Sequence, residues 1–164
     1  MNTPGWLTPL KTWNGSDWGG YLESVFQAFE AGFITRKAIF RGHEVRLRWM
    51  PVHQGKPSAF WHLVQEGQIE EERTPDLRRC ERIEWIRQII DHAGEADIKQ
   101  WENERRGHGG VQRQVLLWLE DQDFLVVLGK REGYFLLLTA YQTDRTHTRS
   151  KLLREYHAFH AGKS

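Results

Sequence analysis

Cysteine is almost missing from this sequence, which contains Cys80 and no other cysteine in 164 residues. A single thiol excludes an intramolecular disulfide and also a zinc site built from several cysteines. Long apolar runs are missing as well, so the sequence predicts neither a signal peptide nor a membrane span. We therefore expect a cytoplasmic protein with no membrane partner, and the length fits one domain with a substantial core.

An excess of one charge is also missing. The 23 basic and 22 acidic residues leave a formal net charge of +1, so any attraction to a polyanion must come from local patches. The sequence has no metal-ligand spacing of the His-Glu-Xaa-Xaa-His or paired-cysteine kind. It also has no nucleotide-binding glycine loop, nucleophile elbow or kinase motif. We therefore expect neither a bound metal nor a cofactor.

What the sequence does have is a high aromatic content and one strongly apolar stretch, residues 123–141. Two apolar runs flank the segment from Gly129 to Gly133, which predicts a central β-hairpin with its turn at those glycines. Strict alternation places Phe135 and Leu137 on the same face as Thr139 and Tyr141. The two hydroxyls, followed by a basic segment, form a candidate site. The alternative is that they simply complete a core strand.

Periodicity and turn residues predict the other elements. Residues 1–20 form an arm rich in Trp, Gly and Pro, and residues 21–161 form the domain. We expect helices at residues 21–31, 58–67, 75–93 and 146–160, and further strands at residues 37–40, 44–49, 98–104 and 115–120. Ser58 and Thr74 are the predicted helix caps. The order predicts an α+β domain in which a twisted antiparallel sheet packs with N-terminal, middle and C-terminal helices.

Two groups in the first half of the chain are candidates for chemistry. Arg46 and Arg48 lie on one face of a predicted strand, where they either clamp phosphates or form a solvated edge that deters aggregation. His62 lies in a predicted helix between apolar neighbours. Imidazole titrates near neutral pH, as a general acid or base must, but a histidine in this position is also common as a packing residue.

A third group begins the predicted helix at residues 75–93. Arg78, Arg79 and Arg82 lie near its N-terminus, where the helix dipole already disfavours cations and favours bound anions. The three arginines therefore form either an anion-attracting corner or ordinary ion pairs with nearby carboxylates, namely those of Asp76, Glu81 and Glu84.

Several short segments together resemble a known family. They are Phe60–Leu63, Arg78–Ile83, Trp101–Asn103, Phe124–Leu128 and Tyr134–Tyr141, followed by His147 and Lys151–Leu152. Over roughly residues 60–156 this set resembles phage-associated proteins of the barnase-EndoU-colicin-RelE-like (BECR) nuclease group. The resemblance implies a small, metal-independent RNA-cutting domain, often a toxin or effector. It also implies a helical N-terminal part followed by a twisted antiparallel sheet.

Cutting RNA without a metal requires a base for the ribose 2′-hydroxyl, an acid for the leaving oxygen, and donors around the phosphate. With the resemblance, the candidate catalytic residues are His62, Arg82, Thr139, Tyr141 and His147. The candidate substrate-binding residues are Arg46, Arg48, Arg78, Arg79 and Lys151. An unperturbed tyrosine has a pKa near ~10, so we expect Tyr141 to donate a hydrogen bond or stack on a base.

Two other functions stay open. A non-enzymatic nucleic-acid-binding module would use the same arginines, with exposed tryptophans as stacking platforms. A structural or interaction protein of a phage or mobile element would instead fold its Trp-rich arm over a partner or a second copy. RNA is the expected partner for the nuclease and for the binding module. A toxic nuclease would also need a protein that neutralises it, and the oligomeric state is left open.

Overall fold

The apolar runs at residues 124–128 and 134–141 form two adjacent strands at the centre of the protein, as the sequence predicts. The computed structural model describes residues 3–66 and 74–162. In it β7 (Phe124–Arg131) pairs antiparallel with β8 (Tyr134–Gln142). The sheet has six strands in the order β1-β2-β8-β7-β6-β5, and the other four are β1 (Ala38–Phe40), β2 (His43–Arg46), β5 (Lys99–Gly107) and β6 (Gly110–Leu119).

One strand pair differs from the predicted antiparallel sheet. β2 lies parallel to β8, with Val45 opposite Phe135, whereas β1 and β2 form the expected hairpin. A parallel pair needs a long crossover connection, and here most of the chain lies between the two strands. The predicted α+β class is therefore confirmed, and the sheet is mixed.

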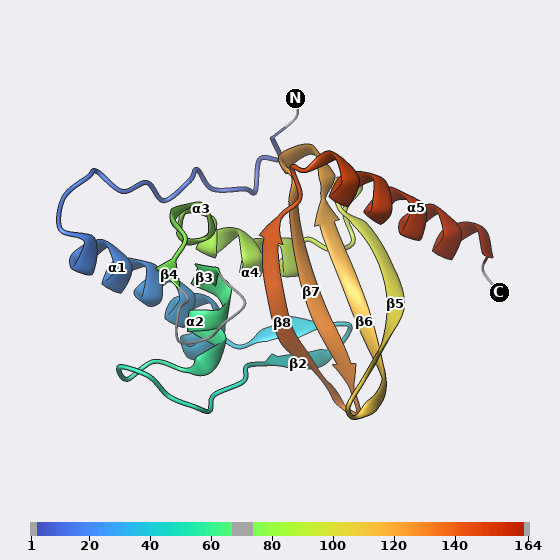
Figure 1. Ribbon diagram of the computed structural model, residues 1–164, viewed down its shortest axis with the longest axis horizontal. Helices are drawn as coiled ribbons and strands as arrows, with labels where there is room; N and C mark the ends of the chain where they lie inside the picture. The colour runs from blue at the N-terminus through green and yellow to red at the C-terminus, as the bar shows by residue number, and fades with distance from the viewer. Residues whose placement is uncertain (1–2, 67–73, 163–164) are drawn as a thin grey trace.

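Helices cover both faces of the sheet (Figure 1). On one face lie α1 (Trp18–Glu30), α2 (Ser58–Val64), α3 (Leu77–Glu81) and α4 (Ile83–Asp91), and on the other lies α5 (Thr146–Gly162). The π-helix η1 (Ala31–Thr35) follows α1, and the 3-10 helix η3 (Glu120–Gln122) connects β6 to β7. Among the described residues, no helix is long and apolar enough to cross a membrane.

A β-bulge in β8 changes which side chains share a face. Val127 pairs with Thr139 and Leu128 with Leu137, which leaves Leu138 as the extra residue. Leu137 therefore packs in the core beneath α1, α2 and α4, while Leu138 and Tyr141 pack in the second core beneath α5. The predicted grouping of Leu137 with Tyr141 is wrong because the bulge resets the alternation between them.

The two hairpin turns at one end of the sheet are tighter than predicted. Glu132 and Gly133 form the β7–β8 turn, so Gly129 lies within a strand. β5 continues to Gly107, which makes Arg105 and Arg106 strand residues and not loop residues as predicted. Gly110 and Gly133 have φ of +95° and +85°, which a glycine adopts without strain.

The helix starts also differ in detail from the predictions. α1 begins at Trp18, because the side chain of Asp17 accepts a hydrogen bond from the Gly20 amide at 3.0 Å. Ser58 is the first residue of α2 and not its cap. The predicted end of that helix, Gly67, lies outside the described residues.

The long helix predicted from Pro75 is two helices. Thr74 and Pro75 form the short strand β4, which pairs with β3 (Gln65–Glu66). Asp76 is the cap in place of Thr74, since its carboxylate accepts from the Arg78 amide at 3.0 Å. At Arg82, φ −107° and ψ 15° break the helix between α3 and α4.

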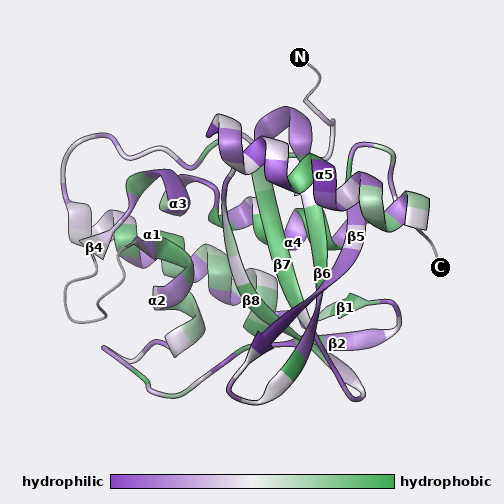
Figure 2. Ribbon diagram, turned by 45° about the vertical axis from the view of Figure 1, so that its right-hand side comes forward, coloured by the Kyte–Doolittle hydropathy of each residue, from purple (hydrophilic) through white to green (hydrophobic). Residues whose placement is uncertain are grey.

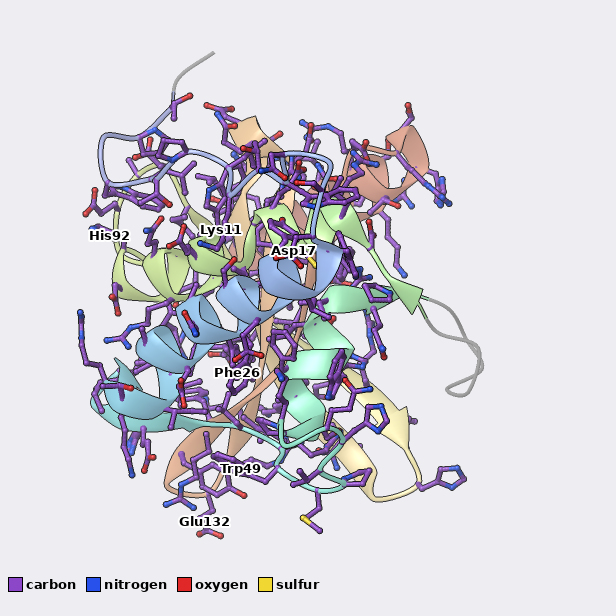
Figure 3. The ribbon with its side chains drawn as sticks, turned by 90° about the vertical axis from the view of Figure 1, so that its left-hand side faces the viewer. Lys11, Asp17, Phe26, Trp49, His92 and Glu132 are labelled. Carbon is purple, nitrogen blue, oxygen red and sulfur yellow. The ribbon has the colours of Figure 1, made fainter. Side chains whose placement is uncertain are left out.

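The N-terminal arm lies against α3 and α4. Trp85 Nε1 donates to the carbonyl of Thr8 at 2.8 Å, and the Lys11 amide donates to the carbonyl of Glu81 at 2.9 Å. Trp6 stacks on His92 with ring centroids 4.4 Å apart. Figure 3 shows Lys11 and His92 on the side of the molecule where the arm passes these helices.

Candidate functional site

The sheet face beneath α5 is covered at one end and open at the other. Leu152 of α5 packs on Trp101, Trp118 and Leu125, toward the connection between β6 and β7. The β5–β6 and β7–β8 turns extend away from α5, and their strands are strongly hydrophilic there (Figure 2). Glu132 in one of these turns and Trp49 after β2 mark this end of the sheet in Figure 3.

Two adjoining cavities occupy the open end. The first has a volume of about 360 Å³ and is lined by four arginines, Arg48, Arg105, Arg106 and Arg131, with Gln112 and Gln114 among the other lining residues. The second has a volume of about 640 Å³, and its lining includes Arg48, His53, His62, Trp61, Met50 and Val52. We call them the arginine cavity and the histidine cavity. They adjoin because Arg48 and Leu138 line both.

Sheet topology brings these arginines together. Arg105 pairs with Gln112 near the β5–β6 turn, and Arg131 pairs with Tyr134 next to the β7–β8 turn. Alternate turns of an antiparallel meander lie at the same end of the sheet. Arg48 follows β2, the parallel neighbour of β8. Segments far apart in the sequence thus contribute cations to one surface.

The arginine cavity has few counter-ions. Glu155 Oε2 lies 3.7 Å from Arg105 Nη2. Within residues 3–66 and 74–162, no carboxylate forms an ion pair with Arg48, Arg106 or Arg131. Guanidinium groups without carboxylate partners favour the approach of an anion.

The opposite face of the same strands is neutralised. The carboxylate of Glu102 lies 2.8 Å from Arg41 Nη1, 3.7 Å from Lys130 Nζ and 3.9 Å from Arg113 Nη1. Burial raises the pKa of Glu102, but the hydrogen bond from Arg41 and the nearby cations bring the pKa below its usual value. Among the described residues at this end of the sheet, the face that carries Glu102 is therefore neutralised, whereas the cavity arginines on the other face have one ion pair, between Arg105 and Glu155.

The predicted arginine corner carries its own counter-ions. Arg78 Nη2 lies 2.7 Å from Asp144 Oδ2, Arg79 Nε lies 3.6 Å from Asp76 Oδ2, and Arg82 Nη1 lies 3.5 Å from Glu81 Oε1. The guanidinium of Arg82 also lies over the Trp85 ring, 5.2 Å from its centroid. Of the two interpretations of these arginines, the structure therefore shows ion pairs. Asp76 and Glu81 are partners as expected, and Asp144 is the third partner where we expected Glu84.

Tyr141 lies in a different hollow from His62. It lines a cavity of about 260 Å³ together with Arg78, Arg79 and Arg145. Burial raises the pKa of its phenol, and this effect outweighs the opposing charges of Arg105 and Arg79. The phenol therefore stays protonated at neutral pH, so Tyr141 donates a hydrogen bond and does not act as a base.

Glu155 connects α5 to the edge of this face. Its Oε1 accepts hydrogen bonds from Trp101 Nε1 at 2.9 Å and from Asn103 Nδ2 at 2.8 Å. With both bonds made, the carboxylate is fixed beside Arg105. α5 thus orients one arginine of the arginine cavity.

The predicted site residues fall into separate places. His62 is exposed on α2 and lines the histidine cavity with Arg48. His147 and Lys151 are exposed on α5, and Thr139 is half-buried on β8. Arg46 lies 3.5 Å from Glu44 and stacks over Tyr134, 4.2 Å from the ring centroid.

The lining residues of the adjoining cavities that the sequence analysis missed include Arg105, Arg106, Arg131 and His53. The first three lie beside hairpin turns, which were treated as exposed connections. The meander itself was a usable signal, because two successive hairpins must place their turns at one end of the sheet. The contribution of His53 has no comparable sequence signal, since its loop is irregular.

Neither the arrangement of possible metal ligands nor similarity to known proteins assigns a function to these cavities. Among the described residues, no group of three His, Cys, Asp or Glu side chains is placed to hold a metal ion. No protein-family model, no curated protein and no solved structure matches the chain.

Proposed function

We propose that this protein is a metal-independent endoribonuclease-like domain that binds RNA across the open end of its sheet. The observation that carries the proposal is the arginine cavity, whose guanidinium groups lack described carboxylate partners except at Arg105 and which adjoins a cavity containing two histidines. A phosphodiester needs cations around its oxygens and a proton-transfer group nearby. The adjoining cavities supply both kinds of group.

The reaction is an internal transesterification. The ribose 2′-oxygen attacks the adjacent phosphorus and loses its proton to a base, while the bond from phosphorus to the 5′-oxygen breaks and that oxygen gains a proton from an acid. The products are a 2′,3′-cyclic phosphate and a 5′-hydroxyl. His62 and His53 line one cavity and are the proposed proton-transfer pair. Arg48 lines both cavities, and in this proposal its guanidinium stabilises the charge that develops on the phosphate.

The resemblance to the BECR group supports this proposal from an independent direction. Its most distinctive segments are Arg78–Ile83 and the strand that ends at Tyr141, and the Phe60–Leu63 segment adds His62 from α2. In this proposal Tyr141 and Arg79 extend the binding surface as a hydrogen-bond donor and a cation. A toxin or phage-effector role, and a protein that neutralises it, belong to the same proposal.

The test is incubation of purified protein with total RNA in EDTA and, separately, in Mg²⁺, with analysis of the RNA ends. We expect cyclic phosphate ends in EDTA. His62→Ala should lower the rate by roughly 10²–10⁴-fold, the usual contribution of general acid–base catalysis. His157→Ala is the matched control, because that histidine is exposed on α5 and is not among the residues lining either adjoining cavity, and it should cut like the wild type. Absence of cleavage in both buffers would refute the nuclease.

A second candidate is a nucleic-acid-binding module without activity. The described side chains that line the arginine cavity are arginines, glutamines, a histidine and a leucine, with no carboxylate among them. Such a lining holds a polyanion without needing any chemistry. Binding of RNA that weakens steeply with salt, with no cleavage in either buffer, would establish this candidate in place of the nuclease.

A further inference from the structure

Gly129 is a buried glycine in the middle of a strand, where no turn requires it. It pairs with Gln114 of β6 and Leu136 of β8. A Cβ atom at this position would lie 2.7 Å from Arg131 Nη1 and 3.2 Å from Leu138 Cδ1. The missing side chain therefore leaves room for the Arg131 guanidinium to lie against the strand.

Arg131 is held there in spite of its place beside a turn. A long side chain next to a hairpin turn ordinarily gains entropy by extending into water. Here Arg131 is half-buried, and its Nη1 donates to the Lys130 carbonyl at 3.2 Å. It lines the arginine cavity with Arg48 and Arg105 and has no carboxylate partner among the described residues. A restrained guanidinium beside two others is suited to an anion that supplies the missing negative charge.

We propose that Gly129 and Arg131 form a phosphate-binding site, with Arg48 and Arg105 facing the same anion. The planar guanidinium of Arg131 presents two parallel donors to two phosphate oxygens. Gly129 is a positioning residue that acts through Arg131. That the phosphate belongs to an RNA backbone rests on the proposed function, whereas the site itself rests on Gly129, Arg131 and the cavity they line.

The test measures how RNA affinity depends on salt in four proteins: wild type, Gly129→Ala, Arg131→Ala and the double variant. The probe is a single-stranded 2′-O-methyl RNA oligonucleotide, which cannot undergo transesterification. Loss of one phosphate contact lowers the slope of log affinity against log salt by ~0.7. We expect that reduction, with affinity about tenfold weaker at low salt, in each single variant. Because Gly129 acts only through Arg131, the double variant should be no weaker than Arg131→Ala.

Lys130→Ala is the matched control. Lys130 is the chain neighbour of Arg131, so this variant also removes one positive charge. Its Nζ, however, lies 3.7 Å from Glu102 on the opposite face of the sheet. Its salt slope should equal that of the wild type. Thermal melts check folding, and Gly129→Ala should melt normally because the nearest obstacle is the end of a flexible side chain.

Several outcomes would overturn the inference. Additive losses in the double variant would show that Gly129 does not act through Arg131, and an equal loss in Lys130→Ala would show only nonspecific charge. If the wild type binds no RNA, the proposed function fails, and titration with inorganic pyrophosphate decides the phosphate site. NMR shifts at the Gly129 amide and Arg131 Nε–H, absent in Gly129→Ala, would support the site. No shifts in the wild type would refute it.

Discussion

Cys80 is fully buried on α3, near the carboxylates of Asp76 and Glu81. Burial first, and then the two negative charges, raise the pKa of its thiol to about 12. At neutral pH the group is therefore a protonated thiol. It serves the core as a small apolar side chain and is unsuited to be a nucleophile or a metal ligand.

Native protein at pH 8 should resist alkylation of Cys80 by iodoacetamide, whereas protein unfolded in urea should react quickly. The folded pKa exceeds the unfolded value of 9.0, so the thiol's contribution to stability is complete below about pH 9 and is lost as pH rises toward 12. Mass spectrometry of labelled protein reads the reaction. Rapid labelling of the folded protein would contradict the buried position of Cys80.

Tyr141→Phe should lower RNA cleavage while leaving the shape of the pH–rate profile unchanged. The hydroxyl is lost as a hydrogen-bond donor, but a phenol whose pKa is raised by burial does not titrate in the working range. A loss of roughly tenfold in kcat/KM is expected for one neutral donor. The profile is measured from pH 5 to 9 on a labelled oligonucleotide. Disappearance of a titrating limb in the variant would instead make Tyr141 the base.

For individual side chains, the sequence predicted properties that depend on the residue itself or on its near neighbours in the chain. The poor fit of Tyr141 to a base was one, and the alternative of ion pairs for the arginine corner was another. Partners distant in sequence were out of reach. Arg78 pairs with Asp144, 66 residues away, and that contact exists only once β8 and α3 are packed together.

The strands and helices show where local pattern is sufficient and where tertiary packing decides. β7 and β8 were predictable because their apolar runs need a buried sheet to satisfy the backbone. The bulge at Leu138, the break at Arg82 and the parallel β2–β8 pair were not. Each depends on how one element packs against another, and none of them produces a periodic pattern in the sequence.

The outer face of the β5–β6–β7 strands yields a prediction about stability. At pH 7, Glu102→Gln should lower the free energy of unfolding by about 1 kcal/mol, since the carboxylate is only 20% exposed and accepts a hydrogen bond from Arg41. The folded pKa of Glu102 is lowered, so this contribution is complete above the unfolded pKa of 4.5 and is lost as pH falls through the folded pKa. Urea unfolding at pH 7 and pH 3 measures it.

Glu104→Gln is the control for that experiment. Glu104 is 57% exposed and lies 3.4 Å from Arg113, so solvent screens the pair and little change in stability is expected. Equal effects of Glu102→Gln at both pH values would mean that the substitution disturbs packing and not charge.

The formal net charge of the whole molecule is +1, but the two faces at one end of the sheet differ in charge. One face of the sheet end carries the paired charges around Glu102, and the other carries the arginine cavity. The sequence predicted the α5 helix but not how much of the sheet it covers. That extent decides which face stays open, and it depends on the packing of Leu152 over Trp101 and Trp118.

The central claim is that RNA binds at the open end of the sheet, on the same face as α5 but beyond the part that α5 covers. The most direct measurement is NMR of arginine Nε–H groups during titration with a single-stranded 2′-O-methyl RNA oligonucleotide. We predict shifts at Arg48, Arg105 and Arg131, and none at Arg41 and Arg113 on the neutralised face. RNA-induced shifts confined to the neutralised face or to the half-buried Arg82 would contradict the claim.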